Sequence, residues 1–164
     1  MGAYVIRREI LEKHHIRFDE NIRMGEDLCL YIKLFTVTNV KSVPLVVAHY
    51  CQHSNSATIS KFDASKWQDM VEIFSLAEPY VEKYRPEWTD KYQQIKDYYA
   101  YRFVWSVIKH GLYHQGLGYI DIYEEFLKRF CHTGHKINDR FKCRCLLTKN
   151  KFLIKLLSGF HIEN

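Results

Sequence analysis

Apolar residues recur at helical spacing through most of the chain beyond residue 60. In residues 63–84 they fall at every third or fourth position, which predicts an amphipathic helix. A longer helix is predicted from about Pro86 to about His114, because proline suits the first turn of a helix. Its apolar face comprises Tyr92, Ile95, Tyr99, Phe103 and Ile108. Further aromatic residues surround the same helix, which predicts that much of it is buried in a core.

Three glycines are predicted to mark the end of this long helix, namely Gly111, Gly116 and Gly118. Beyond them, residues 119–130 have the pattern of another helix, and residues 152–157 form a short amphipathic stretch. Residues 131–150 fit no single pattern. The carboxy-terminal two thirds of the chain are therefore predicted to be mostly helical.

The first third of the chain has a mixed pattern. A short apolar stretch at residues 3–7 and two strand-like runs at residues 40–43 and 45–50 predict β-strands. Helices are predicted at residues 7–14 and from Gly25-Glu26-Asp27 onward, where apolar residues recur at helical spacing.

Small polar residues at 53–60 mark a boundary in the organisation of the chain. Two or three strands are too few for a complete nucleotide-binding domain, which needs several βαβ units of about 30 residues each. We therefore predict an α+β, mainly helical fold. Residues 1–60 are predicted to form the C-terminal edge of an α/β domain, and residues 61–164 an α-helical extension. The other strands of that domain are expected in a preceding segment.

The positive charge is concentrated near the carboxy terminus. Residues 128–155 contain nine Lys and Arg residues and one acid, Asp139, so this block carries +8, while the net charge of +5 leaves −3 for the rest of the chain. Such a block favours contact with phosphate groups, at an anionic membrane surface, on a phospholipid-linked acceptor or on nucleic acid. A solvated basic surface is an equal alternative, and no specific nucleic-acid partner is expected.

The composition is that of an ordinary globular protein, with 47% hydrophobic and 26% charged residues. Arg7, Arg8 and Glu9 stand where a signal peptide would be apolar, and no apolar run approaches the roughly 20 residues of a membrane span. The five cysteines are irregularly spaced, which fits reduced thiols. We expect a cytoplasmic protein, in solution or peripheral to the inner face of the membrane.

Residues 7–56 contain an ordered series of motifs. R-R-E-I-L-E-K-H-H-I-R-F-D-E begins at Arg7, Gly25-Glu26-Asp27 follows at a predicted helix start, and P-L-V-V-A-H-Y-C-Q-H-S-N-S begins at Pro44. In this order and spacing the series resembles the family-2 inverting glycosyltransferases of the GT-A fold. The resemblance implies transfer of a sugar from a nucleotide-sugar donor to a glycan or lipid-linked acceptor, in the synthesis of a cell-envelope polysaccharide or a similar glycan.

In that family the aspartate of the Glu-Asp pair is the catalytic base, and the resemblance places this role on Asp27, with Glu26 beside it. Inverting transfer is a single displacement at the anomeric carbon, so the acceptor hydroxyl loses its proton as it attacks. A carboxylate within hydrogen-bond reach contributes roughly 10²–10⁴-fold in rate. A helix N-terminus also stabilises acids by about 0.3–1 kcal/mol. Ordinary first-turn acids are therefore the alternative interpretation of Glu26 and Asp27.

The motif that begins at Pro44 implies a contact with the diphosphate of the donor. The resemblance places His53 and Ser56 in this substrate-binding segment. Family members often have an arginine where this chain has Cys51, and a thiol cannot replace the bidentate phosphate contact of a guanidinium. A partly exposed structural histidine is the alternative interpretation of His53.

The family also uses a D-x-D-like motif that holds Mg²⁺ or Mn²⁺ across the two phosphates, because hard cations prefer carboxylate oxygens. No two aspartates of this chain have that spacing. The metal site and the nucleotide pocket are therefore expected in the preceding segment of an intact enzyme. We expect this truncated chain alone to bind no such metal and to be inactive.

A group of potential zinc ligands lies in the basic block, consisting of Cys131, His132, His135, Cys143 and Cys145. Zinc held by four of them would be a structural site. Their spacing differs from the usual C-x₂₋₄-C pattern, so unpaired thiols in a helical region are the favoured interpretation. Two rival functions follow from these features: a non-enzymatic helical module that binds anionic partners through residues 128–155, and a zinc-stabilised interaction domain.

Overall fold

The computed structural model describes residues 4–42, 44, 46 and 62–159. Over these residues the chain is mainly helical, with eight α-helices, one 3₁₀ turn and no β-strand. The chain divides into two compact units, residues 1–86 and 87–164. The prediction of a mainly helical fold is confirmed. No helix in the described part is long and apolar enough to cross a membrane.

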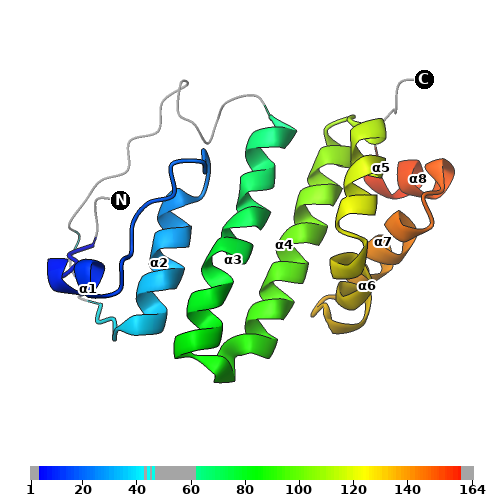
Figure 1. Cartoon of the computed structure of the whole chain (residues 1–164). Coiled ribbons are helices and arrows are strands. Elements are labelled where there is room, and N and C mark those ends of the chain that lie inside the picture. Colours follow the sequence, from blue (N-terminus) through cyan, green and yellow to red (C-terminus); the bar gives the residue numbers. More distant parts are fainter. Residues whose placement is uncertain (1–3, 43, 45, 47–61, 160–164) are drawn as a thin grey trace. The chain divides into compact units, whose positions relative to one another are not determined.

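The first unit is built on two helices that lie side by side, α2 (Glu26–Val37) and α3 (Ala64–Tyr84), with the short helix α1 (Arg8–Lys13) against α2 (Figure 1). All three helices fall where the sequence pattern predicts them. The buried side chains of α2 and α3 form the core of the unit, and they include Cys29, Leu30, Leu34, Val71, Ile73, Phe74, Ala77 and Val81. The apolar residues that recur at helical spacing in the sequence therefore face the core, as expected.

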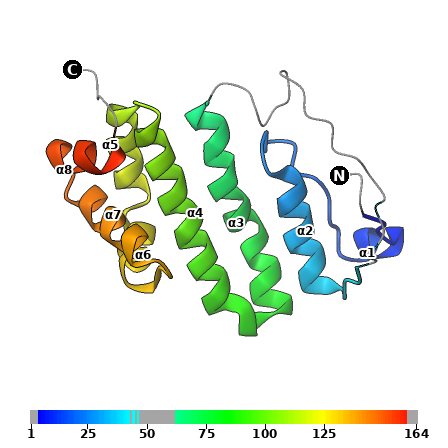
Figure 2. The ribbon, with the colours of Figure 1, turned by 180° about the vertical axis from the view of Figure 1, so that it is seen from behind.

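The second unit contains the remaining helices. Helix α4 packs against α5 and α6, α6 packs against α7, and α7 packs against α8 (Figures 1 and 2). A 3₁₀ turn, Pro86–Trp88, precedes α4. The bounds are α4 (Thr89–Lys109), α5 (Tyr113–Ile122), α6 (Glu124–Thr133), α7 (Ile137–Leu147) and α8 (Lys151–Ser158). The unpatterned residues 131–150 thus contain a helix, α7, whose Cys143 and Leu146 are fully buried.

The prediction for the end of the long helix is wrong in part. Helix α4 ends at Lys109, and Gly111 follows it with a φ of 83°. Gly116 and Gly118 lie inside α5 instead of ending α4. A Cβ atom on Gly116 would clash with Cγ1 of Ile108. Gly116 is therefore explained by the close approach of α5 to α4, which is a tertiary contact that a local pattern does not reveal.

The predicted β-strands are not formed where the structure describes the chain. Residues 4–7 and 40–42 have no strand conformation, so the predicted strands at 3–7 and 40–43 are corrected there. A strand is stable only when a neighbouring strand satisfies its backbone hydrogen bonds, and the described residues offer none. Of the run at residues 45–50, all but Val46 lies outside the described residues. The predicted domain boundary after residue 60 also falls outside them, whereas the compact units divide after Pro86.

The aromatic residues of α4 divide between the core and the surface. Tyr101 and Phe103 are 1% and 5% exposed, as predicted for core residues, and the ring of Tyr101 stacks on that of Phe130 at a centroid distance of 4.6 Å. Tyr98, in contrast, is 38% exposed. Helix α4 is therefore buried along one face and exposed along the other.

Candidate functional site

The start of α2 carries the predicted catalytic pair. Gly25 is the N-cap of the helix, and Glu26 and Asp27 occupy its first turn. Glu26 is exposed and Asp27 is half-buried. The free N–H groups of a helix start favour negative charge, so both carboxylates stand in a position that stabilises them. The helix start predicted at Gly25-Glu26-Asp27 is confirmed.

Gly25 is required by the backbone and by its surroundings. Its φ of 85° lies in the left-handed region, which side chains disfavour. A Cβ atom there would lie 2.7 Å from Sδ of Met70 and 3.3 Å from Cδ1 of Ile73, both on α3. The first turn of α2 is therefore set directly against the middle of α3, and this contact determines where the carboxylate of Asp27 lies.

One oxygen of the Asp27 carboxylate is fixed by its own helix. The backbone N–H of Leu28 donates to Oδ1 of Asp27 at 2.7 Å. Within the described part of the chain no other hydrogen bond reaches this carboxylate. Asp27 is thus held in one orientation and retains the capacity to accept a proton or a hydrogen bond from a hydroxyl group.

Tyr31 lies one helical turn beyond Asp27 and has a buried hydroxyl group. Tyr31 is 8% exposed, and its hydroxyl has no hydrogen-bond partner among the described residues. Its ring packs on Tyr4 and Phe35, with centroid distances of 4.3 and 6.1 Å. Burial, Tyr4 and the charge of Asp27, in that order, raise the pKa of Tyr31. The phenol therefore stays protonated at neutral pH and can donate a hydrogen bond.

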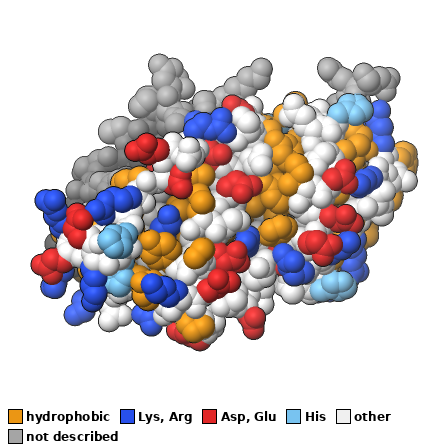
Figure 3. Space-filling view, viewed as in Figure 1, with side chains coloured by type: hydrophobic (Ala, Val, Ile, Leu, Met, Phe, Trp, Pro, Cys, Tyr) orange, Lys and Arg blue, Asp and Glu red, His pale blue; other side chains and the backbone are white. Residues whose placement is uncertain are grey.

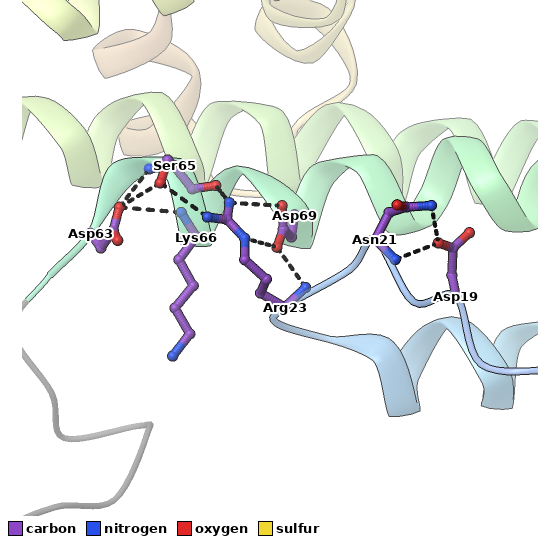
Figure 4. Close-up of polar contacts among 7 residues, drawn as sticks. All are labelled: Asp19, Asn21, Arg23, Asp63, Ser65, Lys66 and Asp69. Atoms are coloured by element: carbon purple, nitrogen blue, oxygen red, sulfur yellow. Dashed lines mark hydrogen bonds and ion pairs between the residues drawn. The ribbon is translucent and has the colours of Figure 1, made fainter.

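The loop before α2 is attached to α3 by Arg23 and Asp69 (Figure 4). The backbone N–H of Arg23 donates to Oδ2 of Asp69 at 2.8 Å, and Nε of Arg23 donates to the same oxygen at 3.3 Å. Nη2 of Arg23 also donates to the backbone oxygen of Ser65 at 2.7 Å. Because Asp69 is buried, these contacts both satisfy its carboxylate and fix the loop that leads to Asp27.

The same network includes the start of α3 (Figure 4). Asp63 caps this helix and accepts hydrogen bonds from the backbone N–H groups of Ser65 and Lys66. The hydroxyl of Ser65 donates to Asp63 at 2.8 Å. These hydrogen bonds lower the pKa of Asp63, and the one from the Ser65 hydroxyl contributes most. The start of α3 is therefore well defined where Arg23 binds it.

The structure places only part of the predicted site. Glu26 and Asp27 are adjacent at the start of α2, whereas His53, Ser56 and Cys51 lie outside the described residues.

Sequence reasoning missed three residues near Asp27. Tyr31 had a local signal, because it stands four positions after Asp27 and so on the same helical face. Arg23 and Asp69 had none, since they are 46 positions apart.

The potential zinc ligands do not form a metal site in the described part of the chain. The three cysteines Cys131, Cys143 and Cys145 are buried, whereas His132 and His135 are exposed. No group of three or more His, Cys, Asp or Glu side chains there is arranged to hold a metal ion. Burial raises the pKa of Cys131 and of Cys143. Their thiols are therefore protonated and packed in the core.

The basic block of residues 128–155 runs through α6, α7 and α8. Six of its nine cations contact groups within the second unit: Lys128, Arg129, Arg140, Lys142, Arg144 and Lys149. On the face shown in Figure 3, acidic and basic side chains are interspersed. Part of the charge that the sequence concentrates in one block is therefore compensated by contacts inside the unit.

Comparison with protein-family models, with curated proteins and with solved structures found no match to this chain. Its function is therefore inferred from its own residues.

Proposed function

We propose that this chain is the C-terminal part of an inverting, nucleotide-sugar-dependent glycosyltransferase and that Asp27 is its catalytic base. The acceptor hydroxyl attacks the anomeric carbon of the donor sugar, and its proton passes to the carboxylate of Asp27. The bond from the anomeric carbon to the nucleoside diphosphate breaks, and the diphosphate leaves with the electron pair. A carboxylate in this role accelerates the transfer by roughly 10²–10⁴-fold.

The observation that carries the proposal is the geometry of Gly25-Glu26-Asp27. A left-handed glycine begins α2, and the next two residues are acids in its first turn. Asp27 is half-buried, oriented by the N–H of Leu28 and close enough to Tyr31 to influence its pKa. An ordinary first-turn acid does not require such a fixed setting. Together with the motifs at Arg7 and Pro44, this arrangement supports the base over a purely structural role.

In this proposal the nucleotide pocket and the metal site of the enzyme belong to a segment that precedes this chain. Residues 1–60 would complete the edge of a GT-A domain whose strands and nucleotide pocket a preceding segment supplies. Mg²⁺ or Mn²⁺ would neutralise the donor diphosphate in that segment, because no two aspartates of this chain have the D-x-D spacing. We place His53 and Ser56 near the diphosphate, Glu26 beside the base, and the intact enzyme in the cytoplasm.

The test begins with the coding sequence upstream of Met1. The proposal expects an open frame, in phase or offset by a frameshift, that encodes βαβ units and a D-x-D motif. The extended protein is then expressed and assayed for release of nucleoside diphosphate from nucleotide sugars. Asp27→Asn should lower kcat by roughly 10²–10⁴-fold, while Glu82→Gln, at an exposed acid of α3 outside the motifs, should leave it unchanged. Unrelated upstream sequence, or full activity of Asp27→Asn, would overturn the proposal.

A second function, contact with an anionic membrane surface, is favoured by helix α8. Phe152 and Leu156 are 73% and 70% exposed and stand one turn apart, while Ile154 is fully buried. Lys151 and Lys155 are also exposed and one turn apart. The outer side of α8 therefore carries an apolar strip next to a cationic strip, which is the pattern of a helix that lies in a membrane interface.

Vesicle flotation tests this second function. Binding to phosphatidylcholine vesicles should increase when phosphatidylglycerol is added and decrease with salt, because exposed charges are screened. Replacing the apolar strip, in Phe152→Ser with Leu156→Ser, should remove most of the binding. Ile122→Ser is the matched control, since Ile122 is 62% exposed on α5. Equal binding of the double variant and the parent would rule out membrane contact through α8.

A further inference from the structure

A cleft of about 430 Å³ in the second unit lies between the carboxy-terminal half of α4 and α7. Both helices pack against α6. Tyr101 and His110 line part of the cleft. The rest of its α4 side is formed by Arg102, Trp105, Ser106 and Lys109. These residues have the spacing i, i+3, i+4 and i+7, so they share one face of the helix. Lys142 lines the opposite side from α7.

The charge of the cleft is positive. Arg102, Lys109 and Lys142 are three permanent cations, whereas Asp139 is the one carboxylate among the lining residues, which gives a net charge of 3 − 1 = +2. That carboxylate already accepts a hydrogen bond from the hydroxyl of Tyr101 at 3.2 Å. The lining therefore neutralises the cations of the cleft only in part.

Two of these cations lie over aromatic rings. Nζ of Lys142 is 5.1 Å from the ring centroid of Trp105, and Cζ of Arg102 is 6.0 Å from that of Tyr98. A cation–π contact holds a cation in place by its charge and leaves its N–H groups able to donate elsewhere. The cleft thus presents three positioned cations against a single carboxylate, together with the flat surface of an indole.

We propose that this cleft binds a phosphate group carried by a phosphate ester or a diphosphate. Guanidinium and ammonium donors form charge-assisted hydrogen bonds to phosphate oxygens, and arginine does so with two parallel bonds. Trp105 offers an apolar surface for the part of the ligand next to the phosphate. The site goes beyond the proposed function and does not depend on it, because Asp27 lies in the first unit and the cleft in the second.

The full chain is titrated with inorganic pyrophosphate while the fluorescence of Trp105 is recorded. Trp67→Phe and Trp88→Phe leave Trp105 as the single tryptophan, and the melting temperature shows that each variant is folded. Saturable binding is expected. Arg102→Gln and Lys142→Gln should each weaken it about tenfold or more, which is the effect of losing a charge-assisted hydrogen bond.

Lys91→Gln is the matched control, because Lys91 is exposed on the same helix α4 but does not line this cleft. It should bind pyrophosphate as the parent does. The proposal is overturned if the titration shows no saturable change, or if Lys91→Gln weakens binding as much as the cleft variants.

A second titration distinguishes a soluble ligand from a lipid headgroup. A response of Trp105 to pyrophosphate but not to phosphatidylglycerol vesicles supports a soluble phosphorylated ligand. A response to both, with pyrophosphate competing against the vesicles, supports a lipid phosphate in the same cleft. The vesicle titration is repeated in the double variant Phe152→Ser with Leu156→Ser, so that α8 does not contribute. A response of this variant to vesicles that pyrophosphate does not reduce would overturn the assignment of phosphate binding to the cleft.

Discussion

The guanidinium of Arg129 on α6 binds the buried carboxylate of Asp97 on α4 through two nitrogen atoms. Nη2 of Arg129 lies 2.9 Å from Oδ1 of Asp97, and Nε lies 3.1 Å from Oδ2. Gln93 donates a further hydrogen bond to Oδ1 at 2.9 Å. The carboxylate is almost fully buried, with its side chain 2% exposed. Arg129 therefore does more than add charge to the basic block, since it satisfies an acid in the core.

Removing this arginine should destabilise the second unit. Arg129→Leu leaves the carboxylate of Asp97 buried without its cation, which we expect to cost about 2–3 kcal/mol. This loss is at or just below the lower end of the usual range for a buried ion pair, because the side chain of Arg129 is 43% exposed. Urea unfolding provides the measurement. Lys128→Leu, which removes only exposed ion pairs, should leave the midpoint unchanged, and equal effects of the two variants would contradict this interpretation.

Tyr31→Phe should be neutral or stabilising by up to about 1 kcal/mol, because it removes a buried hydroxyl with no partner among the described residues. Tyr80→Phe is the control. The hydroxyl of Tyr80 donates to the backbone oxygen of His14 at 3.2 Å, so its loss should cost about 1 kcal/mol. The two unfolding free energies are compared directly. A large loss of stability in Tyr31→Phe would show that its hydroxyl is satisfied.

Two glycine substitutions should have opposite effects. Gly25→Ala forces a side chain into a left-handed conformation and against Met70, and it should destabilise the protein by about 1–2 kcal/mol. Gly118→Ala places a methyl group in open space inside α5, and it should stabilise by about 0.5–1 kcal/mol. Thermal unfolding distinguishes them. Stabilisation by Gly25→Ala would contradict the described start of α2.

The four described cysteines should react slowly with thiol reagents in the folded protein. Cys29, Cys131, Cys143 and Cys145 are buried, and burial raises the pKa of the first three. Since the thiolate is the reactive form, dithionitrobenzoate at pH 8 should react roughly 100-fold or more slowly than with the unfolded chain. A Cys51→Ser variant confines the measurement to these four. Rapid labelling of all four would refute their core positions.

Alkaline pH should destabilise the second unit through Tyr101. Burial, and then the charge of Asp139 and the hydrogen bond to it, raise the pKa of Tyr101 above its ordinary value. The protonated phenol is therefore favoured in the folded state, and its contribution is fully present below a pH of about 10. That contribution is lost as pH rises toward the folded-state pKa. Unfolding free energies measured from pH 8 to 11 should fall less steeply in Tyr101→Phe than in the parent. Identical slopes would contradict the assignment.

The sequence alone determined the helices of the first unit and the local features of the candidate site. In the second unit it placed a helix at residues 119–130, where α5 ends at Ile122 and α6 begins at Glu124, and it did not predict α7. The spacing of apolar residues placed α2 and α3, and Gly25-Glu26-Asp27 marked the start of α2, because periodicity, glycine and first-turn acids act within a few residues. The strand prediction failed in the described residues because a strand does not depend on local sequence alone. A strand depends on a partner strand, which a local pattern does not contain.

Tertiary structure alone decided which distant residues meet. Arg23 forms hydrogen bonds with Asp69, and Arg129 forms an ion pair with Asp97. Gly116 allows the side chain of Ile108 to pack closely against α5. The tertiary structure also places Lys142 over the ring of Trp105 in one cleft. It brings one cation of the basic block, Arg129, against a buried acid. These outcomes depend on how helices pack and on which charges become buried. A buried charge needs a partner close to it in space. That partner can lie at any distance along the sequence, so a local sequence pattern does not identify it.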